Sequence, residues 1–142
     1  MKEDAQFYVG QKAFIHKDGK ILILKDAKRS RMPFDYPGGK IQEGEKDLAE
    51  SLKREVYEET GLEIDVGAAF ATCHTTLPPG HRLGGKHLFL VGYKCEYIFG
   101  DIKLSDEHTS FQWIDRDEHK ALDDGTPFYR MMEKYFEDAK EE

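Results

Sequence analysis

The N-terminal part of the chain contains two runs of apolar and aromatic residues with a turn signal between them. Residues 7–16 alternate loosely between apolar and polar positions, and residues 20–25 contain four consecutive aliphatic side chains. The connecting residues Lys17, Asp18 and Gly19 include Asp-Gly, which is typical of tight hairpin turns because both residues tolerate a positive φ. The pattern predicts two antiparallel strands.

Residues 47–61 have the pattern of an amphipathic helix with a marked start and a marked end. The side chain of Asp47 can accept a hydrogen bond from a free backbone N–H at a helix start, and Glu50 can reach back to it, which makes a capping box. Gly61 can adopt the left-handed conformation that ends many helices. The segment therefore predicts a helix of about three to four turns.

A helical projection of this segment separates an apolar arc from an acidic arc. At roughly 100° per residue, the apolar arc holds Leu48, Ala49, Leu52 and Val56. Glu55, Glu58 and Glu59 fall together beside it, and carboxylates at this spacing repel one another by roughly a few tenths of a kcal/mol per pair. A divalent cation would offset the repulsion, because Mg²⁺ is usually held by carboxylates, waters and phosphate oxygens. A solvated acidic face is the alternative, and the glycines on both sides of the segment count against it.

The second half of the chain alternates strand patterns with loops and ends in a helix. Strands are expected over residues 64–77, 87–97 and 111–114, and a short helix is expected to be capped within residues 115–118. Thr126 as cap and Pro127 at the first position begin a last helix. Its apolar stripe consists of Phe128, Met131, Met132, Tyr135 and Phe136. This order of elements predicts an α+β fold with helices flanking a largely antiparallel or mixed sheet.

Length and charge narrow the class of protein. A chain of 142 residues suits a single domain over residues 1–142 with one hydrophobic core. The net charge of -7 argues against a surface for a nucleic acid polymer, which requires a basic footprint. No secretory signal and no stretch of membrane-spanning length is recognisable, so a cytoplasmic protein without membrane contacts is expected. Cys73 and Cys95 lie in apolar surroundings and are expected to be buried thiols.

A fixed spacing of glycines, carboxylates and one arginine runs through residues 39–62. It reads Gly, five residues, Glu, eight residues, then Arg-Glu-apolar-x-Glu-Glu-x-Gly-apolar, and it resembles the signature of the Nudix hydrolase family, whose members include MutT. The matching positions are Gly39, Glu45, Arg54, Glu55, Val56, Glu58, Glu59, Gly61 and Leu62. The family pattern has seven residues between Glu45 and Arg54. Because Asp47 keeps the usual distance to Arg54, Lys46 is inferred to be the insertion, which leaves the helix undisturbed and bears only on Glu45.

The resemblance implies a fold and a metal site. The fold would be the Nudix α/β/α sandwich, a mixed β-sheet flanked by helices, and the cofactor would be Mg²⁺, or Mn²⁺ in its place. Glu58 and Glu59 would be direct metal ligands, with the carbonyl of Gly38 completing the shell. Glu55 would be a further ligand or the general base, and Arg54 would orient Glu55 and its neighbours by charged hydrogen bonds.

Several family members take the general base from a later loop. The candidates in this chain are Asp106 and Glu107, which precede the strand pattern at residues 111–114, and Glu107 is the preferred choice. Glu96 is an alternative inside a strand, and His108 could line the site. Catalytic residues are therefore expected to be Glu55, Arg54 and Glu107.

The substrate would be a nucleotide or nucleotide derivative. Gly39 would let the backbone approach a phosphate, and Arg29 and Arg31 in the basic loop of residues 26–35 could clamp one, although a solvated loop is an equal reading. The compact chain and the loop of residues 105–109 favour a (deoxy)nucleoside triphosphate, cleaved to a nucleoside monophosphate and pyrophosphate.

Other functions stay open at this point. Pro78 lies near the position of a proline that marks the ADP-ribose branch, so an ADP-ribose or sugar-nucleotide pyrophosphatase is an alternative. A nucleotide-binding Nudix module without turnover and a structural dimer with a solvated acidic helix are alternatives of other classes. The expected assembly is a monomer or a homodimer.

Overall fold

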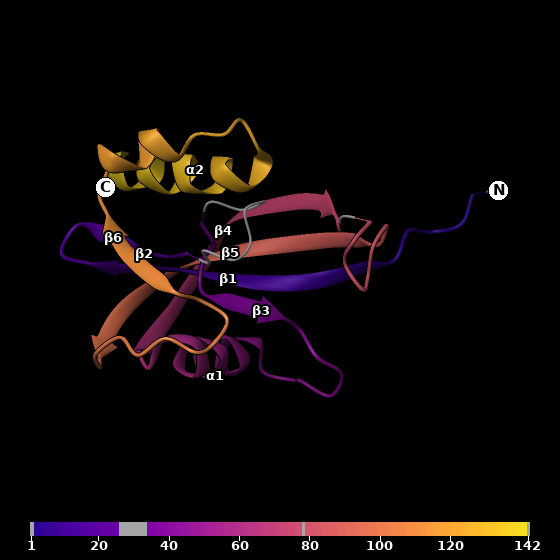
Figure 1. The fold of residues 1–142 in the computed structure, drawn as a ribbon, viewed down its shortest axis with the longest axis horizontal. Coiled ribbons are helices and arrows are strands. Elements are labelled where there is room, and N and C mark those ends of the chain that lie inside the picture. The colour runs from indigo at the N-terminus through magenta and orange to yellow at the C-terminus, as the bar shows by residue number, and fades with distance from the viewer. Residues whose placement is uncertain (1, 26–33, 78, 142) are drawn as a thin grey trace.

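The computed structural model describes residues 2–25, 34–77 and 79–141, which form a sheet between two helices (Figure 1). The elements are β1 (Phe7–Lys17), β2 (Lys20–Lys25), β3 (Gly38–Lys40), α1 (Leu48–Thr60), β4 (Glu63–Thr76), β5 (His87–Phe99), β6 (Ser110–Ile114), the 3₁₀ helix η1 (Glu118–Leu122) and α2 (Pro127–Glu141). Within the described chain the sheet has six strands in the order β4-β5-β1-β2-β6, with β3 paired to β1. β1 and β5 are parallel, and the other pairs are antiparallel.

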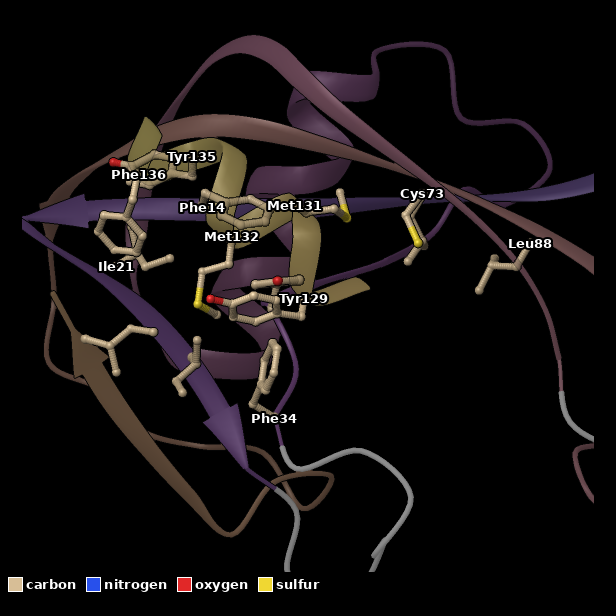
Figure 2. Close-up of a cluster of buried hydrophobic side chains, with 14 residues drawn as sticks. Phe14, Ile21, Phe34, Cys73, Leu88, Tyr129, Met131, Met132, Tyr135 and Phe136 are labelled. Carbon is tan, nitrogen blue, oxygen red and sulfur yellow. The ribbon is translucent and has the colours of Figure 1, made fainter. Parts of the chain in front are cut away.

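Each helix covers one face of the sheet, and each face has its own core. Ala13 and Ile15 of β1 face α1, whereas Phe14 between them faces α2, as the alternation of a strand requires. The core under α1 comprises Ala13, Ile15, Leu22, Leu24, Leu52, Val56, Leu62, Ile64 and Cys95. Figure 2 shows the core under α2, where aromatic and methionine side chains of the helix meet β1 and β2. The predicted mixed sheet and α/β/α sandwich are therefore confirmed.

The local signals that marked turns and helix ends are also confirmed. Asp18 and Gly19 have φ angles of 52° and 77°, as the predicted hairpin turn requires. Asp47 caps α1 by accepting from the backbone N–H of Glu50 at 3.1 Å, and Gly61 ends the helix with a φ of 78°. The Glu50 side chain pairs with Lys53 at 3.4 Å, and no return bond from Glu50 to the Asp47 backbone is found among the described residues. Both cysteines are buried free thiols.

The strand β3 was not expected from the sequence, and it fills a fork in the sheet. β1 pairs with β2 only at His16 and Lys17, and upstream of these residues the two strands separate. The segment leading into β3 bonds to β2 through Asp35 and to β1 through residues 37–40. Gly38 has a φ of 143°, and a Cβ there would overlap the backbone carbonyl of Gln11. A glycine is therefore required where the chain enters the fork.

No helix in the described part of the chain combines the length and the apolar character needed to cross a membrane. The prediction of a single domain over residues 1–142 stays a prediction.

Replacing Asp47 with alanine tests the start of α1. The variant loses the side-chain acceptor for the Glu50 amide, and loss of such a cap typically costs about 1 kcal/mol, so the free energy of unfolding in urea should fall by about that amount. Asp47→Asn keeps an oxygen at the same position and should retain most of the stability. Equal unfolding midpoints for the wild type and Asp47→Ala would contradict the cap.

Candidate active site

Two of the three helical carboxylates point toward β3. Glu55 and Glu59 lie one turn apart on α1, and Glu59 Oε1 accepts a hydrogen bond of 2.8 Å from the backbone N–H of Gly38. The Glu55 carboxylate occupies the space that a Cβ at residue 39 would need. Glycine at position 39 therefore allows Glu55 to come close to the backbone of β3.

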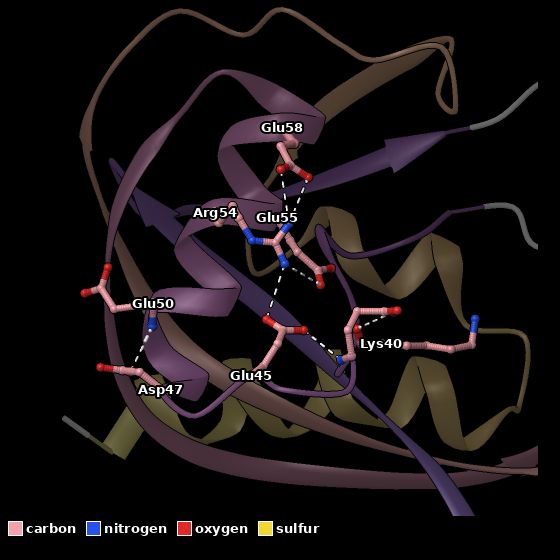
Figure 3. A network of polar contacts seen from close by, with 8 residues as sticks. Lys40, Glu45, Asp47, Glu50, Arg54, Glu55 and Glu58 are labelled. Carbon is pink, nitrogen blue, oxygen red and sulfur yellow. Dashed lines mark hydrogen bonds and ion pairs between the residues drawn. The ribbon is translucent and has the colours of Figure 1, made fainter.

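The third carboxylate, Glu58, belongs to a network around Arg54 that also reaches Glu55 at 3.7 Å (Figure 3). Glu58 is 60% exposed and accepts two hydrogen bonds from Arg54, at 3.1 and 3.2 Å. The other end of the guanidinium contacts Glu45 at 3.3 Å, and Glu45 also accepts from the backbone N–H of Gln42 at 2.7 Å. Arg54 thus joins α1 to the turn before it, and the extra residue inferred at Lys46 does not remove Glu45 from this contact.

Burial changes the proton affinity of both carboxylates that face β3. Burial raises the pKa of Glu59 to about 7, against the opposing effects of Lys12 and of the hydrogen bond from Gly38. Burial also raises the pKa of Glu55, although Arg54, 3.7 Å away, acts in the other direction. A cation near these carboxylates would offset the cost of keeping them ionised.

A half-buried lysine lies in the fork of the sheet next to these carboxylates. Lys12 Nζ is 3.0 Å from Asp35 Oδ1 and donates to the carbonyl of Tyr36 at 3.3 Å. Burial opposes the charge on Lys12, but Asp35 and Glu59 outweigh it, so the pKa of Lys12 lies above its ordinary value. Burial likewise disfavours ionised Asp35, yet Lys12 and His108 hold the pKa of this carboxyl below its usual range. The pair is therefore charged at neutral pH.

His108 connects the Asp35 carboxylate to Glu59. Its side chain is 8% exposed, with Nε2 3.8 Å from Asp35 Oδ2 and Nδ1 3.8 Å from Glu59 Oε2. Asp35 is the main cause of a raised pKa at His108, which burial opposes. The loop that carries His108 is bonded to α1 and to β2. Ser105 N donates to Glu59 O, and Thr109 N donates to Lys25 O.

The donor groups gathered here fit a divalent cation. Among the described residues, ligand atoms of Glu59, Glu107 and His108 lie within 4.8 Å of one another. His108 Nδ1 is buried, and no described residue forms a hydrogen bond with it. Carboxylate oxygens and an imidazole nitrogen are common ligands of divalent metals.

Several residues predicted for the site lie elsewhere or outside the described chain. Arg29 and Arg31 fall outside the described residues, so their predicted phosphate contacts stay predictions. Glu96 pairs with His16 at 3.1 Å, four residues beyond the point where β1 meets Gly38. Asp106 and Glu107 are both exposed, and Glu107 belongs to the cluster with Glu59.

Sequence reasoning missed Lys12 and Asp35. Nothing in the alternation of β1 marks Lys12, and its partner lies 23 residues further along the chain. In the sequence, His108 is marked only by its position beside Glu107. Lys12, Asp35 and His108 are far apart in the sequence, and only the folded structure, with its fork in the sheet, brings them together.

Comparison with known proteins identifies the family of this chain. The family model described as NUDIX domain matches residues 11–136. The human protein named nucleoside diphosphate-linked moiety X motif 6 is 25% identical over 122 residues, which is 86% of this chain and 38% of that protein. The chain thus spans well under half the length of this curated relative.

Solved structures share the fold. A MutT protein from Methanosarcina mazei Go1 superposes with a TM-score of 0.78 at 24% identity, covering 99% of this chain and 100% of that chain. An ADP-ribose pyrophosphatase from Streptococcus suis superposes with a TM-score of 0.60 at 19% identity, covering 79% of this chain and 76% of that chain. With the family match extending from β1 to α2, the chain belongs to the NUDIX domain family.

Proposed function

We propose that the protein is a divalent-cation-dependent pyrophosphohydrolase that acts on a nucleoside diphosphate-linked substrate. The observation that carries the proposal is the buried Glu59 carboxylate, which bonds to the Gly38 amide through one oxygen and faces His108 with the other. The family match and the name of the human relative, which refers to a nucleoside diphosphate-linked moiety, support the same substrate class.

Glu59 is the proposed principal metal ligand. Its Oε2 lies 3.8 Å from His108 Nδ1, its carboxylate belongs to the cluster with Glu107, and a cation would offset the cost of its burial. Glu58 and the Gly38 carbonyl stay proposed ligands, but the Glu58 carboxylate already bonds to Arg54. A divalent cation held by these groups would neutralise phosphate oxygens and acidify a water molecule.

The proposed general base is a carboxylate beside this cation. Glu107 is the first choice because its carboxylate lies within 4.8 Å of the ligand atoms of Glu59 and His108. Glu55 is the second choice, since burial raises its pKa toward the range in which general bases work well. Arg54 acts as a positioning residue that contacts Glu55 as well as Glu45 and Glu58.

The favoured substrate is a nucleoside triphosphate, cleaved to a nucleoside monophosphate and pyrophosphate. The full-length likeness to a MutT protein supports this choice. An ADP-ribose or sugar-nucleotide substrate is the second candidate, supported by the likeness to an ADP-ribose pyrophosphatase. Pro78, the residue that suggested this branch, lies outside the described residues.

A substrate panel tests the proposal. With Mg²⁺ present, nucleoside triphosphates should yield pyrophosphate and nucleoside monophosphate, because attack is expected at the bond nearer the nucleoside. ADP-ribose and sugar nucleotides belong in the same panel, with Glu59→Gln as the blank. Turnover confined to ADP-ribose would move the substrate to the second candidate. Release equal to the blank for every substrate and pH would favour a binding module without turnover.

Matched amide substitutions separate the two adjacent glutamates. Glu59→Gln removes the charge of the buried carboxylate and is expected to lower kcat/KM by about 100-fold or more. Glu58→Gln changes an exposed carboxylate and should cost clearly less. Steady-state kinetics of both variants, with circular dichroism to check folding, makes the comparison. A greater loss for Glu58→Gln would contradict the ranking of the ligands.

The raised pKa of Glu59 predicts a pH dependence of cation binding. Below about pH 7 a proton occupies this carboxylate and competes with the cation, whereas above it the proton is lost and the cation gains a charged ligand. The rise in melting temperature caused by Mg²⁺ should therefore be larger at pH 8 than at pH 6.

Without a cation, ionisation of Glu59 at higher pH lowers the free energy of unfolding, whereas with a cation it strengthens binding. The folded pKa lies above the ordinary carboxyl value of 4.5, so the Glu59 contribution to stability is lost as pH rises toward about 7. Glu59→Gln should remove the pH dependence of the Mg²⁺-induced shift and the pH dependence of the stability without a cation. A Mg²⁺-induced shift of the wild type that is the same at pH 6 and pH 8 would count against this account.

A further inference from the structure

The ring of His108 presents an unused nitrogen to the buried carboxylate of Glu59. The side chain is more than nine-tenths buried, and Nδ1 lies 3.8 Å from Glu59 Oε2. That distance is too long for a hydrogen bond, and no other described residue forms one with Nδ1. Because buried polar atoms are normally satisfied, a partner other than the described residues is expected at this nitrogen.

The opposite ring nitrogen faces a carboxylate, as it does in many metal-binding histidines. Such a histidine usually directs its second ring nitrogen at a carboxylate, which fixes the tautomer and the ring orientation. Here His108 Nε2 lies 3.8 Å from Asp35 Oδ2, while Asp35 Oδ1 is occupied by Lys12 Nζ and by the Tyr36 amide. With its proton on Nε2, the ring offers a lone pair at Nδ1.

The backbone around His108 is fixed on both sides. Ser105 N donates to Glu59 O at 3.0 Å, so the loop is attached to the same residue whose side chain faces the ring. Thr109 N donates to Lys25 O at 2.9 Å, which attaches the other side of the loop to the end of β2. The imidazole is therefore positioned relative to Glu59 by two hydrogen-bonded anchors.

We propose that His108 Nδ1 and Glu59 Oε2 bind the same divalent cation, with the Glu107 carboxylate beside them. The inference rests on the proposed function, in which Glu59 is a cation ligand. Mg²⁺ prefers oxygen ligands, whereas later first-row ions such as Co²⁺ and Zn²⁺ accept imidazole readily. The nitrogen therefore shifts the preference of the site from Mg²⁺ toward a transition-metal ion.

Calorimetric titrations with Co²⁺ alone and with Mg²⁺ alone test the ligand. His108→Gln keeps a polar side chain and removes the imidazole, so the dissociation constant for Co²⁺ should rise by about tenfold or more. The value for Mg²⁺ should change by less than about threefold, because oxygen ligands dominate its binding. His16→Gln, which alters a partly exposed histidine paired with Glu96, is the matched control and should change neither. Equal effects of His108→Gln on both ions would overturn the proposal.

Proton NMR of the Co²⁺-loaded wild type gives a second readout. An imidazole bound to Co²⁺ shows a strongly shifted, exchangeable N–H signal, which should be present at one equivalent of Co²⁺, absent in His108→Gln and retained in His16→Gln. If His108→Gln does not fold, His108→Asn takes its place. No such signal in the wild type would mean that His108 is only a structural partner of Asp35 and Glu59, and would overturn the inference.

The outcome is separable from that of the proposed function. Pyrophosphate release with Mg²⁺ but without the shifted signal would leave the hydrolase standing and remove the histidine ligand. The signal without turnover of any substrate would leave a metal site in a protein that is not a hydrolase.

Discussion

The hydrogen bond from the Gly38 amide to Glu59 is the contact on which the site depends. It joins β3 to α1 and holds one oxygen of a carboxylate that is almost fully removed from water. Burial at this point raises the pKa of Glu59 to about 7, so the residue can ionise at neutral pH only because positive charge or hydrogen-bond donors face it. The Gly38 amide donates to Oε1 of Glu59, and Oε2 faces His108 at 3.8 Å, where a cation could bind.

The fork in the sheet explains how these partners assemble. Where β1 and β2 separate, Asp35 bonds to β2 through its backbone and the residues after it bond to β1. Lys12 occupies this fork and neutralises Asp35, which in turn lies against His108. A break in strand pairing thus becomes a polar site, and its partly buried charges are paired, which offsets the cost of their burial.

The sequence was sufficient for the parts of the structure that depend on local chemistry. Asp47, Gly61, the Asp-Gly turn and Thr126 each act over a few residues, and each marks the end of an element that the structure contains. The strand β3 could not be predicted, because its three residues have no alternating pattern and are held only by pairing with β1. Likewise, a helical projection groups Glu55, Glu58 and Glu59, but it does not show that Glu55 and Glu59 face β3 while Glu58 is exposed and bonds to Arg54.

The most direct test of the account is the position of the cation itself. Anomalous diffraction from a crystal grown with Mn²⁺ and a non-hydrolysable nucleoside triphosphate analogue would locate it. The account predicts a peak in bonding contact with Glu59 Oε2, beside His108 and Glu107. A peak held by Glu58 alone, with Glu59 contacting only the Gly38 amide, would contradict it.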